Sequence, residues 1–266
     1  MPSNYAHYRF AAHMLPLLPG DVRRPVQRYR RLYDIGLHGP DIFYYYFPAL
    51  KSSRAFLGIK FHEQTGKEFF QRVCRTARLD GSEAAQACLY GILCHYCLDS
   101  VLSPVIRAQA EACGVPVLEM ETEFDRFLLQ TDGKLPPHRQ ELTAHLRLSA
   151  QEAETVAKFY PPATGKTVLE SLRAMRMTRR LLTAPEGGGR KLLEQGIRAG
   201  GKQTAAMLMT TQPNPRCAEK NALLLEAYGQ AEETFARLLP QLMAHMTYNA
   251  PLEEPFHKRF DGSADL

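Results

Sequence analysis

The chain has 266 residues but no uninterrupted apolar run near the ~20 residues that a membrane-spanning helix needs. Its first seven residues contain nothing like the apolar core of a secretory signal peptide. Internal repeats and low-complexity segments are also missing, and 45% of the residues are hydrophobic, which is enough for a substantial core. We therefore expect a folded protein of the cytoplasm.

The six cysteines lack the spacing of a zinc finger. Cys94 and Cys97 form a C-x-x-C pair, but no second pair accompanies it at a suitable distance. A reducing compartment would keep all six as thiols. Because the pair lies inside an apolar segment, we interpret both as small core residues; a redox or zinc motif is the less favoured alternative.

A strong excess of one charge is lacking too, since the formal net charge is only +5. This mildly basic balance suits an anionic substrate, but many proteins of other functions share it. Arginines recur at 23–31, and again at Arg176, Arg179 and Arg180. We interpret both groups as solvated helix faces, with peripheral contact to an anionic membrane surface as the alternative. A nucleic-acid partner is not expected.

No stretch alternates apolar and polar residues over enough positions to predict a strand, whereas helix signals are frequent. The sequence predicts an all-α, single-domain multi-helix bundle over 1–250, followed by a loose tail at 251–266. Asp21 is the predicted N-cap of one helix, and Ser149 with Glu152 predicts a capping box for another. The expected helices cover residues 5–18, 21–34, 63–79, 83–100, 119–131, 149–159, 165–183, 190–209 and 217–247.

The segment 84–98 is apolar on nearly every side and carries no charge before Asp99, which predicts a helix in the middle of the bundle. His95 and Asp99 stand four residues apart and therefore share one helix face. A buried carboxylate is costly unless something compensates it. A hydrogen bond with His95, an arginine partner and a metal ion are the three possibilities, and this helix alone does not separate them.

Other residues with suitable side chains stand elsewhere in the first hundred positions. His7 lies on the first predicted helix, Asp41 in a glycine-containing loop at 36–41, and His62 just before Glu63. Imidazole and carboxylate groups are the ligands expected for zinc and similar catalytic ions. Each residue alone is weak evidence, because most histidines bind no metal.

Four stretches, taken in order, carry a resemblance to a known family: 5–10, 36–41, 93–100 and 119–127. Together they resemble the bacterial zinc-dependent phospholipase C family, a distant relative of the fungal zinc-dependent single-strand nucleases. The resemblance implies a helical fold of that type with a metal cluster at the end of a central bundle. It covers about the first half of the chain, and the later half is similar only in being helical.

Position by position, the resemblance implies a first metal bound by Asp41, His62, His95 and Asp99. Asp99 would bridge to a second metal, which His7 would also bind. A free amine at Pro2 is a further implied ligand of this second ion. His62 is placed by its order in the chain more than by a local motif.

The chain departs from the family's third metal site. The resemblance expects two histidines and a glutamate there, but the sequence has Ser103 and Val117, and only Glu121 remains. Valine cannot bind a metal, so we predict two zinc ions. The loss also puts phospholipase C activity itself in doubt, because the third ion of the family helps to hold the substrate phosphate.

Two metals can clamp a phosphoryl group and activate a water molecule. Asp41, Glu63 and Glu121 are the candidate proton acceptors, with Asp41 preferred. His38 is a candidate partner that orients Asp41, and the tyrosines at 44–46 are candidate pocket walls.

The predicted function is a metal-dependent hydrolase of phosphate esters, a phospholipase C-like phosphodiesterase. Its substrate would be a small phosphate ester or a phospholipid head group. The main alternative is a catalytically degenerate metal-binding or scaffold protein of the same fold. A structural bundle in which His95 and Asp99 only bond each other is the remaining possibility.

Overall fold

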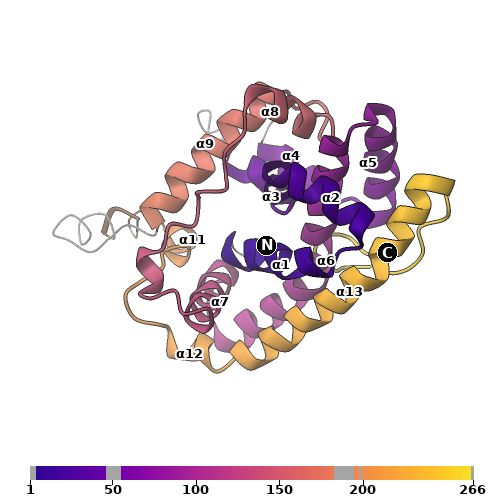
Figure 1. Cartoon of the computed structure of the whole chain (residues 1–266). Coiled ribbons are helices and arrows are strands. Elements are labelled where there is room, and N and C mark those ends of the chain that lie inside the picture. The colour runs from indigo at the N-terminus through magenta and orange to yellow at the C-terminus, as the bar shows by residue number, and fades with distance from the viewer. Residues whose placement is uncertain (1–3, 46–54, 183–194, 198, 200, 265–266) are drawn as a thin grey trace.

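The computed structural model describes residues 4–45, 55–182, 195–197, 199 and 201–264, and these residues form helices and no strand (Figure 1). The predicted all-α fold is therefore confirmed. The first half contains α1 (Asn4–Met14), η1 (Leu15–Leu17), α2 (Gly20–Arg28), α3 (Arg30–Gly36), η2 (Gly39–Tyr45), α4 (Ala55–His62), α5 (Gly66–Asp80), α6 (Glu83–Cys113) and α7 (Val117–Thr131). The second half contains η3 (Pro137–Arg139), α8 (Ala150–Ala157), α9 (Gly165–Leu182), α11 (Lys202–Ala206), α12 (Pro215–Ala218) and α13 (Asn221–Tyr248).

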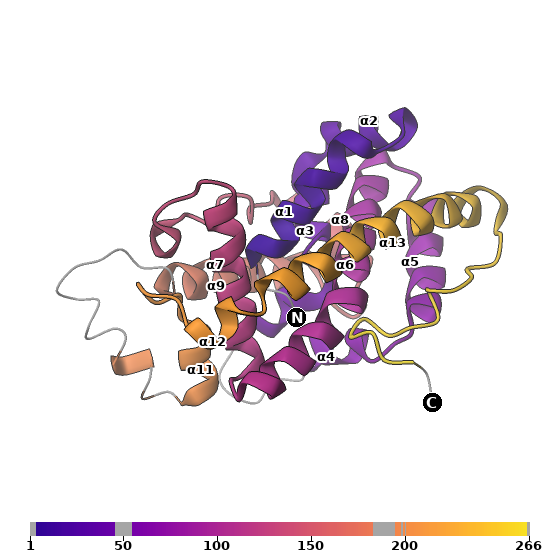
Figure 2. The ribbon, with the colours of Figure 1, turned by 90° about the horizontal axis from the view of Figure 1, so that it is seen from below.

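Helix α6 is the centre of the bundle, as its all-round apolar sequence predicts. Figures 1 and 2 show α13 lying along it, and α3 packs against another side. Ser82 caps its first turn by accepting the N–H of Ala85, and Gly114 ends it in the left-handed conformation, with φ of 63°. The helix passes through Pro104, and so it continues well beyond residue 100, where we expected it to end.

The length of α6 also corrects the expectation that no segment could cross a membrane. An 18-residue window of α6 is apolar enough for a span, but 83% of that window is buried inside the fold. A helix covered in this way by its own chain is typical of the core of a helical protein.

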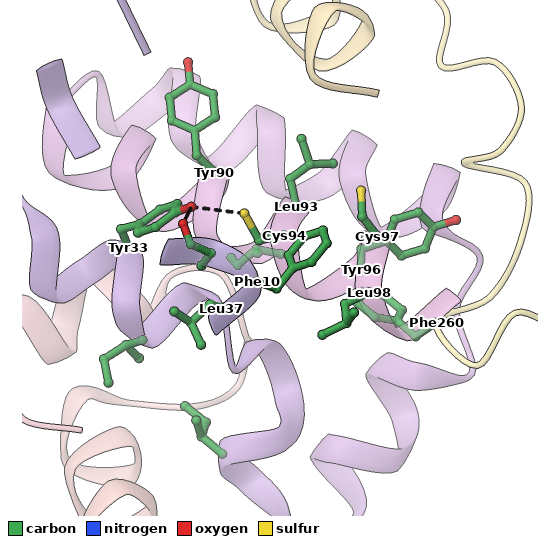
Figure 3. Close-up of a cluster of buried hydrophobic side chains, with 14 of the residues drawn as sticks. Phe10, Tyr33, Leu37, Tyr90, Leu93, Cys94, Tyr96, Cys97, Leu98 and Phe260 are labelled. Atoms are coloured by element: carbon green, nitrogen blue, oxygen red, sulfur yellow. Dashed lines mark hydrogen bonds between the residues drawn. The ribbon is translucent and has the colours of Figure 1, made fainter. Parts of the chain in front are cut away.

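Close contact between α3 and α6 depends on two glycines. A Cβ atom on Gly36 would lie 2.3 Å from the carbonyl oxygen of Cys88, and one on Gly91 would lie 2.3 Å from that of Tyr33. Tyr33 then places its hydroxyl 3.2 Å from the sulfur of Cys94 (Figure 3). Cys94 and Cys97 are both buried and form no disulfide, which confirms their interpretation as core residues.

Several helix boundaries differ from the prediction. The segment 21–34 is two helices, because Tyr29 leaves the helical conformation between α2 and α3. Asp21 lies inside α2, so it is not the N-cap. The helix expected from residue 63 starts at Gly66, and Thr65 caps it in a capping box with Glu68. The predicted capping box of Ser149 and Glu152 is present on α8.

The C-terminal segment is packed, in contrast to the loose tail that we expected from residue 251. Phe256 and Phe260 are fully buried. Tyr96 of α6 donates its hydroxyl proton to the backbone oxygens of Pro255 and Lys258, both at 2.9 Å. The backbone N–H of Gly66 also donates to Lys258, at 2.8 Å. Part of the helix predicted over 190–209 lies outside the described residues, and α11 is the short helix found in the remainder.

Candidate metal centre

Four side chains with potential metal-binding atoms, from three separate helices, meet at one buried point. His7 comes from α1, Asp41 from η2, and His95 with Asp99 from α6. One potential ligand atom from each of them lies within 4.8 Å of all the others. Distant parts of the chain therefore converge in the way that the candidate ligand set requires.

Asp99 occupies the centre of this group. One of its oxygens, Oδ1, lies 3.4 Å from Nε2 of His7. The other, Oδ2, lies 3.5 Å from Nε2 of His95 and 3.6 Å from Nε2 of His62. His62 also faces Asp41, with 3.0 Å between Nε2 and Oδ1. All five residues singled out as metal ligands thus lie together, and the two oxygens of Asp99 point to different histidines.

His62, the least secure residue of the predicted set, is oriented by its own helix. Its Nδ1 lies 2.7 Å from the carbonyl oxygen of Gly58, one turn earlier on α4. This contact assigns the proton to Nδ1 and directs Nε2 toward the carboxylates, an arrangement that is common for metal-binding histidines. Burial lowers the pKa of His62, but Asp41 and Asp99 outweigh it and raise the pKa to about 10.

Gly39 allows η2 to approach α6 closely. Its φ is +50°, and a Cβ atom would lie 2.3 Å from Cδ2 of the His95 ring. Any other residue would therefore push against the imidazole while also adopting an unfavourable backbone conformation. The glycine in the loop at 36–41 consequently brings Asp41, two residues later, up to His95.

The first turn of α1 is held by a residue that the sequence analysis did not single out. Asp125 of α7 accepts the backbone N–H groups of Tyr5 and Ala6, at 2.9 and 2.8 Å. A carboxylate is well suited to the partial positive charge of a helix N-terminus. Asp125 therefore fixes the backbone immediately before His7. Its partners lie about 120 positions away, so no local pattern could reveal this role.

The chemistry of the cluster fits zinc. Buried nitrogen and oxygen atoms face one another without forming hydrogen bonds of normal geometry to any described residue: Nε2 of His7, His62 and His95, and Oδ1 of Asp41 and Asp99. Burial alone would raise the pKa of Asp99, but His95, His62 and His7 together hold it well below its ordinary value. An ionised carboxylate among imidazole nitrogens is a ligand set that zinc accepts.

Residues 6–102 match the model of the zinc-dependent phospholipase C family. The predicted family resemblance is confirmed over this segment. No curated protein and no solved structure matches the chain. The part that matches the zinc-dependent phospholipase C family contains His7, Asp41, His62, His95 and Asp99.

The positions that the family resemblance assigns to a third metal lie on α6 and α7, beyond the matched residues 6–102. Ser103 is buried in α6, and Val117 begins α7. Glu121 is buried as well, and burial raises its pKa to about 7. Glu63, by contrast, is exposed at the end of α4 and lies outside the buried cluster. Of the three candidate proton acceptors, Asp41 and Glu121 are therefore the two inside the site.

We expected the His38 ring to orient the Asp41 side chain, but the ring pairs with His145 instead. Its ring is buried and its Nε2 lies 2.7 Å from Nε2 of His145, although its backbone oxygen does accept the N–H of Asp41. Burial and the neighbouring His145 hold the pKa of His38 well below its ordinary value, and burial lowers that of His145 to about 4. Because the two Nε2 atoms lie within hydrogen-bonding distance, one of them donates and the other accepts, so at least one of the two rings is neutral. The two residues are 107 positions apart, which concealed the pair in the sequence.

One small cavity joins two of the candidate metal ligands to the later half of the chain. His7 and Asp41 line it together with Glu121 of α7 and Arg179 of α9. Tyr45 lines it too, whereas Tyr44 lies against His62 and Tyr46 falls outside the described residues. Arg179 is thus directed into the site and not onto the solvated face that we expected. The remaining lining residues are Asn4, His38, Leu118, Met175 and Met207.

Proposed function

We propose that this protein is a dinuclear metal-dependent phosphoesterase related in mechanism to zinc-dependent phospholipase C. The proposal depends on one observation, the buried convergence of His7, Asp41, His95 and Asp99. His62 completes the set, and the two oxygens of Asp99 suit a ligand shared between two ions.

Bound zinc lowers the pKa of a coordinated water to ~7 and so provides a nucleophile at neutral pH. The protein residues would hold and position the reactants. His7, His62 and His95 present their Nε2 atoms to the centre. Their burial excludes bulk water, which strengthens electrostatic interactions with an anionic substrate.

We infer that Glu121 is the proton acceptor. Its pKa of about 7 lets it take up a proton near neutral pH, and it lines the cavity beside His7 and Asp41. Asp41, which we had preferred from the sequence, faces His62 within the ligand cluster. A carboxylate cannot readily serve as ligand and base with the same oxygens, so Glu121 suits this role better.

Elemental analysis of protein purified without chelators or an affinity metal is the first test. Two equivalents of zinc are expected, and Asp99→Asn should reduce them. His7→Ala tests the second ion, and His13→Ala is the matched control because His13 lies on the same helix with its side chain 46% exposed. Equal zinc content in all variants would contradict the proposed ligands.

Hydrolysis of a chromogenic phosphodiester by the zinc-loaded protein then separates an enzyme from a scaffold. Activity that falls in Glu121→Gln at unchanged zinc content supports catalysis with Glu121 as base. Zinc binding without any hydrolysis would favour the degenerate metal-binding alternative. If the purified protein contains no zinc, the remaining interpretation is a structural bundle in which His95 and Asp99 only bond each other.

We propose a small phosphate ester or a phospholipid head group as the substrate, because both are anionic and bound cations would attract them. Peripheral membrane contact through the arginines of 23–31 has less support, because Arg28, Arg30 and Arg31 form ion pairs with Glu83, Asp34 and Glu152. Liposome sedimentation with and without anionic lipid would test that contact directly.

A further inference from the structure

Arg179 is the positively charged side chain among the residues that line the candidate active-site cavity. It comes from α9, which lies outside the part of the chain that matches the zinc-dependent phospholipase C family. The other ionisable groups around this cavity are His7, His38, Asp41, Tyr45 and Glu121. A guanidinium keeps its charge under all conditions in which the protein is folded.

The position of Arg179 is defined by its neighbours. Its Cζ lies 5.5 Å from the centroid of the Tyr45 ring, so the guanidinium stacks above an aromatic face. Tyr45 belongs to η2, the same short helix that carries Asp41. Burial lowers the pKa of Arg179, but Tyr45, Asp125 and Glu121 outweigh it, and Glu121 lines the same cavity. The cation is therefore tied to both elements that flank the metal ligands.

We propose that Arg179 binds the non-bridging oxygens of the substrate phosphoryl group, opposite the metal-binding side chains. The proposal rests on the proposed function for its substrate. A planar guanidinium can donate two parallel hydrogen bonds to a phosphate, which a single metal ion does not do. It would supply positive charge in the cavity that Glu121 lines, the one residue that remains of the family's third metal position.

Arg179 has a matched control on its own helix. Arg173 lies on α9, carries the same charge and is exposed, but does not line the cavity. Arg179→Met and Arg173→Met remove the same charge from the same helix. Arg179→Lys keeps the charge but cannot donate two parallel hydrogen bonds in one plane.

Calorimetric titration of each zinc-loaded variant with inorganic phosphate tests the proposal without relying on activity. We expect Arg179→Met to weaken phosphate binding about 10- to 100-fold at unchanged zinc content, since hydrogen bonds between charged groups are lost. Arg179→Lys should give an intermediate affinity, and Arg173→Met should bind like the wild type. An unchanged phosphate affinity in Arg179→Met would overturn the proposal.

A second measurement on the wild-type protein covers the case in which Arg179→Met does not fold. Phosphate should slow the modification of Arg179 by phenylglyoxal, as followed by peptide mass spectrometry, and should leave Arg173 unaffected. Equal rates at Arg179 with and without phosphate would overturn the proposal.

The two proposals can fail separately. If the protein hydrolyses phosphodiesters but its phosphate affinity does not depend on Arg179, only the role of Arg179 is contradicted. Phosphate binding through Arg179 without hydrolysis would sink the proposed catalysis and leave the anion site in place.

Discussion

Asp125 of α7 accepts the backbone N–H groups of both Tyr5 and Ala6, and so it fixes the helix turn from which His7 reaches the candidate metal centre. This contact links the part of the chain that matches the family to a helix beyond it. The geometry at His7 therefore depends on a residue outside the candidate ligand set.

Replacing Asp125 should weaken binding of the proposed second metal, which His7 would ligate, more than binding of the first. Asp125→Asn keeps the shape but removes the charge that two backbone donors require, which should cost about 1–2 kcal/mol of stability. We expect zinc content to fall toward one equivalent per chain. Asp132→Asn is the control, because Asp132 binds the Tyr5 hydroxyl and Arg9 on the same helix without holding its first turn. Zinc loss of equal size in both variants would contradict a specific role for Asp125.

Gly39 should tolerate no side chain. A Cβ atom there meets the His95 ring, so Gly39→Ala should cost about 1–3 kcal/mol from overpacking, in addition to backbone strain. Gly114→Ala isolates the strain, because Gly114 has φ of +63° with open space around it. Chemical denaturation should show a larger loss for Gly39→Ala, together with lower zinc content. Equal losses of stability in the two variants, with full zinc content in both, would argue against the steric explanation.

Removal of the metal should destabilise the whole fold. Chelation would leave Asp41 and Asp99 buried without their cations. When the free zinc concentration is well above the dissociation constant, the bound ion should raise the melting temperature by about 10 °C. Differential scanning calorimetry before and after EDTA treatment measures this shift, and added zinc should restore it. Asp99→Asn should show almost no response to EDTA, whereas a full response would mean that zinc binds elsewhere.

The His38–His145 pair should make the protein sensitive to mild acid. In the unfolded chain histidine has a pKa of ~6.5, whereas in the fold burial lowers that of His145 to about 4. Between these pKa values the unfolded state binds a proton that the folded state does not bind. The free energy of unfolding therefore falls as the pH drops through this window.

His145→Gln removes the titrating group and can still bond to His38. Its free energy of unfolding should depend less on pH between about 6.5 and 4, by about 1–2 kcal/mol relative to the wild type. His13→Gln, with a half-exposed ring, is the control. Parallel pH profiles for His145→Gln and wild type would reject this account.

Much of the fold and of the ligand set could be predicted from the sequence, because the signals are local. The apolar run at 84–98 predicts a buried helix, and the spacing of His95 and Asp99 places both on one face. His7, Asp41 and His62 came from residue type and from the family resemblance, and the structure brings them to the same point.

The remaining part of the site depends on contacts between distant residues. Arg179 was interpreted as solvated because its helix carries several arginines, and the sequence does not show which of them faces inward. Asp125 and His145 act through partners more than 100 positions away. Tyr29 interrupts a helical pattern that looked continuous, since backbone conformation at a junction is set by packing as much as by propensity.

Phe260 packs against two of the candidate metal ligands, with its ring centroid 5.3 Å from that of His62 and 5.7 Å from that of His95. The segment after α13 is thereby coupled to the candidate centre through ring contacts, although Phe260 offers no ligand atom. A change of side chain at residue 260 would consequently disturb the surroundings of two histidines at once.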